Sequence, residues 1–127
     1  MKRNALIVLC IILIISTGCV PVLIGGAGIV TGYMMSNDSA IGDVRVSYRE
    51  LWDISIEVLQ NSDKVEIIET NESKGRIKIK MDGVDLTVKI NTLDSENQQL
   101  KVSARKYMLP KPKYAQKIFF NIVKELE

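Results

Sequence analysis

An alternating pattern on both sides of Asp82-Gly83 restricts the fold of this chain more than any other feature. Every second residue is apolar, and most of the residues between are charged. The apolar members are Ile77, Ile79, Met81, Val84, Leu86, Val88 and Ile90. Side chains of a strand point alternately to two faces, so this period of two predicts strands with one buried face. Asp82-Gly83 suits a type I′ turn because both residues tolerate positive φ. The segment therefore predicts a β-hairpin.

Further strands are predicted on both sides of this hairpin. After the polar loop 91–98, the alternation returns in Leu100, Val102 and Ala104. Val65-Glu66-Ile67 begins the run of strands, and a short half-buried strand around Val44 and Val46 comes before them. The segment 108–112 cannot continue a strand, because its prolines lack the N–H donor that a ladder needs.

Two helices complete the pattern. Ser47 with Glu50 three residues later forms a capping box, which predicts a helix from there to about Gln60. The second helix is expected over residues 114–126. Their inward faces are expected at Leu51, Trp52, Ser55, Val58 and Leu59, and at Ala115, Ile118, Phe119, Ile122 and Leu126. Trp52 could instead stack on a ligand, but a tryptophan on an apolar stripe is more often part of the core.

Together these elements predict an α+β domain over residues 41–127. It would have a four-stranded, mainly antiparallel sheet with the element order β-α-β-β-β-α. The sheet has one apolar face, and two amphipathic helices packed on that face would bury it.

The first 18 residues predict an export signal. Lys2 and Arg3 precede an apolar stretch over residues 5–15, and small residues lead from there to Cys19. This order is typical of a secretory signal peptide. A cysteine at the cleavage point resembles the lipobox of bacterial lipoproteins, which implies that the Cys19 thiol receives a lipid. The alternative is an uncleaved membrane helix, but the stretch is shorter than the ~20 residues that a span needs.

Residues 19–40 are expected to form a lipidated, Gly-rich, apolar tether next to the membrane. Gly28 and Gly32 are four residues apart, and Ala27 and Thr31 repeat that spacing. In a bilayer such spacing lets helices approach closely. The segment would be a tether or would contact the membrane. The alternative interpretation is a true transmembrane helix, although the segment is short for a span.

Composition removes several classes of chemistry. The chain has no histidine, and both of its cysteines lie within the first 19 residues. Metal sites and Ser-His or Cys-His catalysis are thereby disfavoured, and we expect no metal, no cofactor and no enzymatic activity. The chain has 17 basic and 15 acidic residues, and removal of Lys2 and Arg3 leaves 15 of each. A balanced charge gives no reason to expect nucleic acid as a partner.

The order of these features resembles one family. A lipobox, a Gly/Ala-rich stretch ending near Tyr33 and a helix with Trp52 are followed by Lys74-Gly75-Arg76-Ile77, the Asp82-Gly83 hairpin and a terminal Ala115-Gln116-Lys117-Ile118 helix. In this order of features the chain is similar to small, mostly proteobacterial lipoproteins of the domain-of-unknown-function 3568 family. The resemblance covers essentially the whole mature chain. Its motifs are turn glycines and core positions, so it implies a fold and a location and no catalytic residues.

The polar face of the sheet carries the one candidate site besides Cys19. A two-residue turn at Asp82-Gly83 and a regular second hairpin set the cross-strand neighbours. The expected pairs are Lys80 with Asp85, Arg76 with Lys89, Ile90 with Leu100, Lys89 with Lys101, and Asp85 with Arg105. Arg76, Lys89 and Lys101 then form a cation row, whose members repel one another unless an anion or a partner lies over them. The alternative is an ordinary solvated face.

These observations predict a non-enzymatic binding or scaffolding module held on the bilayer through acylated Cys19. The expected partners of the cation row are another envelope protein or anionic lipid. Val20 directly after Cys19 resembles the outer-membrane sorting signal, which implies an outer-membrane location facing the periplasm. A membrane-active oligomer assembled through Gly28 and Gly32 is the alternative, and an enzyme with a cryptic site is a third.

Overall fold

A computed structural model describes residues 2–5 and 30–126 of the chain, of which residues 2–5 are helical. The remaining elements form one α+β unit. The strands are β1 (Val30–Met35), β2 (Ser39–Val44), β3 (Val65–Asn71), β4 (Arg76–Met81), β5 (Val84–Thr92), β6 (Gln98–Lys106) and β7 (Leu109–Pro110). The helices are α2 (Tyr48–Asn61) and α3 (Pro112–Glu125).

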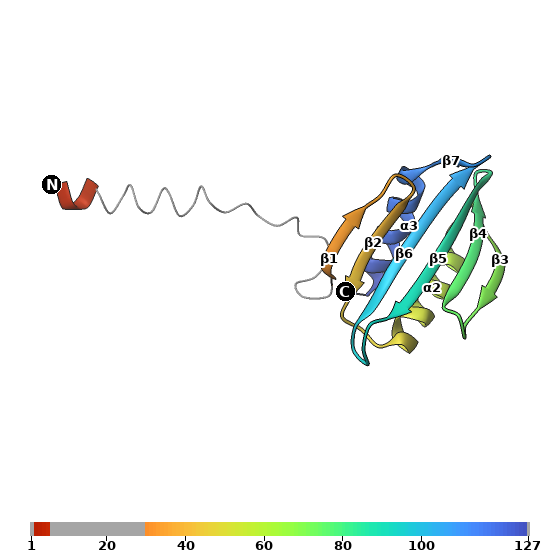
Figure 1. Ribbon diagram of the computed structural model, residues 1–127, viewed down its shortest axis with the longest axis horizontal. Coiled ribbons are helices and arrows are strands. Elements are labelled where there is room, and N and C mark those ends of the chain that lie inside the picture. The colour runs from red at the N-terminus through yellow and green to blue at the C-terminus, as the bar shows by residue number, and fades with distance from the viewer. Residues whose placement is uncertain (1, 6–29, 127) are drawn as a thin grey trace.

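All strand pairings are antiparallel, in the order β1-β2-β6-β5-β4-β3, with β7 on the end of β6. Both helices lie behind the sheet in the view of Figure 1. The predicted α+β class, the antiparallel sheet and the two helices on one face are confirmed. The predicted number of four strands is wrong, because the sheet has seven.

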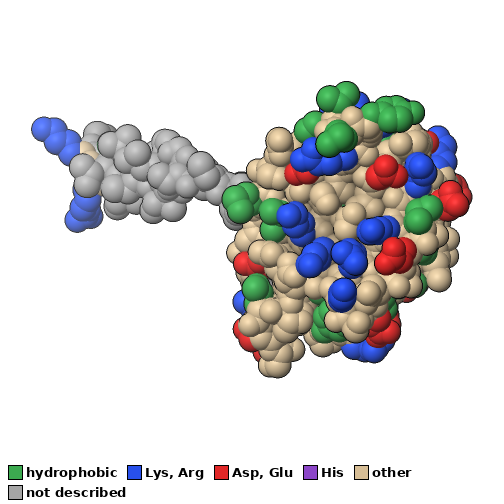
Figure 2. All heavy atoms as spheres, turned by 45° about the vertical axis from the view of Figure 1, so that its right-hand side comes forward, with side chains coloured by type: hydrophobic (Ala, Val, Ile, Leu, Met, Phe, Trp, Pro, Cys, Tyr) green, Lys and Arg blue, Asp and Glu red, His purple; other side chains and the backbone are tan. Residues whose placement is uncertain are grey.

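The other face of the sheet is open. Lys and Arg side chains gather near its middle in Figure 2, and acidic side chains lie mostly around them. Neither helix covers this face, so its side chains are free to meet a ligand or a partner.

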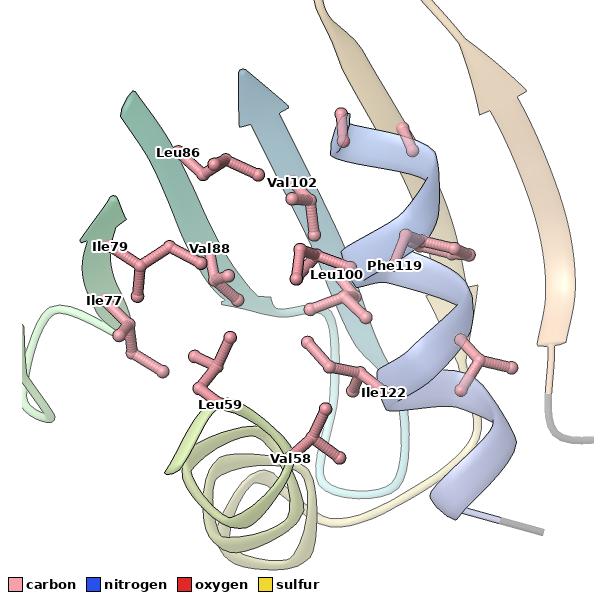
Figure 3. Packing of buried hydrophobic residues seen from close by; sticks show 14 of the residues in the cluster. Val58, Leu59, Ile77, Ile79, Leu86, Val88, Leu100, Val102, Phe119 and Ile122 are labelled. Atoms are coloured by element: carbon pink, nitrogen blue, oxygen red, sulfur yellow. The ribbon is translucent and has the colours of Figure 1, made fainter. Parts of the chain in front are cut away.

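The core lies between the sheet and the helices. Figure 3 shows Val58 and Leu59 of α2 and Ile122 of α3 pointing toward the residues of β4, β5 and β6. The Phe119 side chain of α3 lies over Gly42 of β2. The buried strand residues include Ile77, Ile79, Leu86, Val88, Leu100 and Val102. The predicted inward faces of both helices are buried, Trp52 among them. Ser47 caps α2 by accepting a hydrogen bond from the Glu50 N–H at 3.2 Å.

The domain begins earlier than predicted. β1 lies inside the segment expected to be a tether, and it pairs with β2 from Val30 opposite Val44 to Met35 opposite Ala40. Tyr33 holds this edge strand on α3, because its ring lies 5.3 Å from that of Phe119 and 5.4 Å from that of Phe120. The described sheet therefore includes Val30–Met35, which lie before the predicted domain start at Ile41. The uncharged sequence of β1 carries no alternation that would have indicated a strand.

The first predicted strand was placed too late. β2 covers Ser39–Val44 and ends before Val46. Its inward residues are Ala40, Gly42 and Val44, and the first two are too small to read as an apolar stripe. They are small because α3 packs close to the strand: a Cβ atom at Gly42 would lie 2.5 Å from Cζ of Phe119.

Two more strands were not counted in the predicted four-stranded sheet because each breaks the expected pattern, although the start of β3 at Val65 was predicted. β3 is an edge strand whose register shifts between Ile67 and Glu69, and Ile68 at this irregularity is 56% exposed. Such a bulge interrupts the alternation on which the prediction depended. β7 contains Pro110, yet it pairs with Arg105 at the end of β6. Proline is tolerated there because an edge position needs no second row of donors.

The helical interpretation of the small-residue spacing does not hold for Thr31 and Gly32. Both lie in β1, where Gly32 pairs with Asp43. Their partners in that spacing, Ala27 and Gly28, lie outside the described residues. A pair of which one member is in a strand cannot form a continuous small-xxx-small face of a helix.

We predict that the Tyr33 ring, and not its hydroxyl, holds β1 on α3. The hydroxyl is buried without a hydrogen-bond partner in the described structure. Tyr33→Phe should therefore leave the free energy of unfolding unchanged or higher, because an unsatisfied polar group is removed. Tyr33→Ala should lower it by about 2–4 kcal/mol through loss of the aromatic packing. Urea unfolding followed by circular dichroism measures both, and a larger loss for Tyr33→Phe than for Tyr33→Ala would contradict this account.

We also predict that Gly42 is required by the helix packed above it. Gly42→Ala should cost about 1–3 kcal/mol of stability, since the added methyl group overlaps the Phe119 ring. Gly32→Ala on the neighbouring strand is the matched control. There the new Cβ would meet only Asp43 Oδ2, at an ordinary 3.8 Å. The control should change stability by less than about 0.5 kcal/mol. Equal losses for the two variants in the same unfolding assay would show that crowding under α3 is not the cause.

Candidate functional site

The open face consists of rows of side chains that cross the strands. Residues opposite one another in antiparallel strands have neighbouring side chains, so each row follows from the register. One row crosses six strands, and its members are Asn71, Arg76, Lys89, Lys101, Ile41 and Met34. The cation row predicted from the sequence forms the middle of it.

The registers predicted for the cation row are confirmed. Arg76 of β4 faces Lys89 of β5, and Lys89 faces Lys101 of β6. All three side chains are partly exposed. Among the described residues, none of the three takes part in an ion pair. The Nε atom of Arg76 is also buried without a hydrogen-bond partner there. The cation row therefore presents positive charge that the described part of the chain does not neutralise.

A second row on the same face shows the contrast. Its members alternate in sign: Glu66, Lys80, Asp85 and Arg105. Lys80 Nζ lies 3.8 Å from Asp85 Oδ1, and Arg105 Nε donates to Asp38 Oδ2 at 2.8 Å. The predicted pairs of Lys80 with Asp85 and of Asp85 with Arg105 are confirmed. In this row every cation has an acidic neighbour.

The row between these two is nearly neutral. It holds Glu69, Lys78, Thr87, Ser103 and Ser39, and its one cation pairs with its one acid at 3.9 Å. Like charges directly opposite each other across strands are unfavourable, with pair energies of roughly 0.2–1 kcal/mol. The cation row is thus the place on this face where like charges lie directly opposite one another.

The surroundings of the cation row suit an anionic ligand. The amides of Gln99 and Asn91 lie beside it on the same face, 3.4 Å from each other. Toward the β1 edge the row continues into Ile41 and the 63%-exposed Met34. Guanidinium and ammonium donors next to neutral amides can bind carboxylate or phosphate oxygens through charge-assisted hydrogen bonds. The patterns around Met34 and Ile41 were too irregular for sequence reasoning to place these two residues here.

Asp38 is a further polar residue that sequence reasoning missed. Its carboxylate accepts hydrogen bonds from Ser39 Oγ at 2.9 Å, from Ser36 Oγ at 3.3 Å and from Arg105. Burial of the carboxyl raises its pKa, but the hydrogen bonds from Ser39 and Arg105, together with the positive charge of Arg105, outweigh that effect. The net pKa of Asp38 is lowered. The residue lies in the β1–β2 connection, so no strand pattern could have placed it opposite Arg105.

Outside this face the described residues offer little for catalysis. An open hollow of about 270 Å³ lies between the C-terminal ends of α2 and α3, and Glu57, Asn61 and Lys124 are among its lining residues. Within residues 2–5 and 30–126, no group of three His, Cys, Asp or Glu side chains is placed to hold a metal ion. Asp94 caps its own loop by accepting from the N–H groups of Glu96 and Asn97 at 2.9 Å. These hydrogen bonds, together with the one from the Asn97 side-chain amide, lower the pKa of Asp94. Such hydrogen bonding is typical of a residue that stabilises a turn.

Cys19, the predicted lipidation site, lies outside the described residues. The structure therefore does not place it relative to the cation row. None of the helices in the described ranges is both long enough and apolar enough to cross a bilayer.

The fold defines a small α+β domain whose open sheet face carries the cation row. The chain belongs to the family described as "Protein of unknown function (DUF3568)", whose family model matches residues 2–106. The match ends with β6, before α3. The family predicted from the sequence motifs is thereby confirmed, whereas the lipoprotein character expected of it stays a prediction.

Other comparisons add no function. No curated protein matches the chain. A conserved protein of unknown function from Enterococcus faecalis has a similar solved structure, with 11% sequence identity, coverage of 76% of each chain and a TM-score of 0.44. A likeness this distant carries no argument.

We predict that the ion pair between Asp38 and Arg105 stabilises the fold at neutral pH and that this contribution is lost at acid pH. A carboxyl whose folded-state pKa is lowered stabilises the fold above its unfolded-state pKa, and this contribution is lost as the pH falls through the lowered value. Asp38→Asn should therefore be less stable than the original protein at pH 7, and the difference should shrink below about pH 4. Urea unfolding across this range measures it. A difference that grows at acid pH would contradict the assignment.

Proposed function

We propose that this chain is a membrane-anchored envelope lipoprotein that works as a non-enzymatic binding module, with the open sheet face as its binding surface. The cation row carries this proposal. Arg76, Lys89 and Lys101 lie side by side without an ion pair among the described residues. The adjacent row of Glu69 and Lys78, and the row of alternating signs beyond it, contain such pairs. An anionic surface over the row would relieve the repulsion, so the partner is anionic.

The anchor in this proposal is acylated Cys19. The order of a positive start, an apolar stretch and small residues before the cysteine supports it. One acyl chain gives marginal membrane binding and two give stable anchoring, so a lipidated domain need not supply membrane affinity itself. Its rigid sheet can serve to present a surface. The sorting residue Val20 supports an outer-membrane location facing the periplasm.

A non-enzymatic role fits the side chains available. The chain has no histidine. Two of its carboxylates on the open face are engaged in ion pairs, Asp85 with Lys80 and Asp38 with Arg105. Asp43 lies apart from these, opposite Gln99. A face with cations and amides can hold an anion. Its hollows are open ones, such as that of about 190 Å³ lined by Asp85, Ser103 and Arg105, whereas most small-molecule sites bury the greater part of their ligand. Binding is therefore favoured over catalysis.

The test uses the full chain carried in neutral phosphatidylcholine vesicles. Two anionic probes are offered on a surface: vesicles with phosphatidylglycerol, which stand for a lipid partner, and polyglutamate, which stands for an acidic protein. We expect binding to at least one probe. Lys89→Glu combined with Lys101→Glu should weaken it at least about tenfold, because each charge near an anionic surface is worth about fivefold.

The single variant Lys89→Glu separates lost binding from lost folding. It places an acid between Arg76 and Lys101, which reproduces the alternating signs of the row that contains Lys80 and Asp85. We expect it to raise stability by up to about 1 kcal/mol while it weakens binding. Lys117→Glu, an exposed position on α3, changes the net charge equally and is the control. Binding that survives Lys89→Glu, or that falls equally with Lys117→Glu, would refute the sheet face as the binding surface.

A further inference from the structure

The turn between β6 and β7 exposes three consecutive large apolar residues, which we call the apolar turn. Tyr107 is 88% exposed, Met108 85% and Leu109 62%. Other exposed large apolar residues in the described ranges, such as Ile68 and Leu93, stand singly on separate elements. Single exposed apolar residues are ordinary, whereas contiguous ones mark contact sites. Hydrophobic side chains gather at this end of the molecule in Figure 2.

The backbone of the apolar turn is strained. Tyr107 has φ of 50° and Met108 has φ of 68°, a conformation that costs free energy for residues with a Cβ atom. Two-residue hairpins of this kind favour Asn-Gly or Asp-Gly. The sheet uses that preference at its other tight turn, Asp82-Gly83. Formation of the turn therefore does not explain why tyrosine and methionine occupy it, and such strain clusters at functional positions.

Surrounding groups hold the strained turn in place. Arg105 Nη1 donates to the Met108 carbonyl at 3.1 Å, while Arg105 Nε is held by Asp38 at 2.8 Å. The Lys111 N–H donates to the Ala104 carbonyl at 2.9 Å, which closes the β7 side. The apolar side chains are thus presented on a rigid support.

The apolar turn has a basic collar. Lys106 precedes it, with Nζ 5.9 Å from the centre of the Tyr107 ring, and Lys111 and Lys113 follow it. In the described part of the chain none of these three lysines forms an ion pair. Three exposed apolar side chains, with lysines next to them in the chain that lack a described ion pair, match a partner that is apolar inside and anionic at its surface.

We propose that the apolar turn inserts into the head-group region of an anionic bilayer, with Lys106, Lys111 and Lys113 against the lipid phosphates. Tyrosine is favoured at the level of the head groups, and lysine stems reach along apolar surface while their charges stay in water. Anionic lipids attract clustered lysines. A protein groove is the poorer match because lysine is depleted at protein interfaces. This inference is independent of the ligand of the cation row.

The apolar turn and the start of β1, which follows the proposed anchor, lie at opposite ends of the sheet. Val30 pairs with Val44, which pairs with Gln98, so the chain enters the sheet at the opposite end of β6 from the apolar turn. That strand spans about 27 Å. The chain from Cys19 to Val30 reaches at most about 40 Å. Both ends of β6 can therefore touch the bilayer that holds the anchor, and the two contacts would hold the strands along the membrane plane.

The test places a tryptophan in the apolar turn of the full chain. Met108→Trp, with Leu109→Trp as a second variant, is reconstituted in vesicles that contain brominated phosphatidylglycerol or brominated phosphatidylcholine. Trp52 is buried and gives a constant background that the unsubstituted protein measures. We expect the tryptophan emission to be blue-shifted. Brominated phosphatidylglycerol should quench it strongly, and brominated phosphatidylcholine should quench it weakly. Ile68→Trp on the far edge strand is the matched control and should stay unquenched.

Charge variants in the Met108→Trp background test the collar. Lys111→Gln and Lys113→Gln should each lower the ratio of inserted to free turn about fivefold, and Lys117→Gln, further along α3, should not change it. Three results would overturn the inference. They are quenching no stronger than that of Ile68→Trp, equal quenching in both lipids, or a blue shift that needs no vesicles and grows with protein concentration, which would indicate a second copy as the partner.

Discussion

Burial of one sheet face under two helices is the constraint from which the rest of this structure follows. α2 and α3 cover alternate residues of β4, β5 and β6, and the register that buries Ile77, Val88 and Val102 together leaves no freedom for the residues between them. A slip by one residue would turn every apolar side chain to solvent. The positions of Arg76, Lys89 and Lys101 on the open face are thus a consequence of core packing, even though their mutual repulsion opposes it.

Sequence reasoning succeeded where the local pattern and the tertiary contacts agree. The strands around Asp82-Gly83 and both helix faces follow from periodicity, and the cation row follows from the turn length. It failed at the sheet edges. β2 places the small Ala40 and Gly42 inward because α3 approaches closely at Gly42. β1 shows no alternation, and β3 contains a bulge. At each edge the residue types depend on contacts with residues far away in the chain. A short stretch of sequence does not contain those residues.

The two surfaces differ in how the structure supports them. The cation row lies on a flat face and depends on strand register, whereas the apolar turn depends on one arginine, because Arg105 holds both Asp38 and the Met108 carbonyl. Asp38 comes from the β1–β2 connection, so the edge strand that sequence analysis missed also supports the apolar turn. With an acylated Cys19, such a domain would carry anchor, anionic-ligand site and second membrane contact on separate parts of the chain.

The sequence by itself determined the period of the strands, the tight turn at Asp82-Gly83, the amphipathic helices and the family, because these depend on neighbours within a few residues. Only the tertiary structure decided that Val30–Met35 is a strand and that Tyr33 packs on α3. It also decided that the cation row has no ion pair within residues 2–5 and 30–126, whereas Arg105 pairs with Asp38. The physical reason is that a side chain's ion pairs and packing partners depend on segments brought together by folding. Asp38 and Arg105 meet only because β2 lies beside β6.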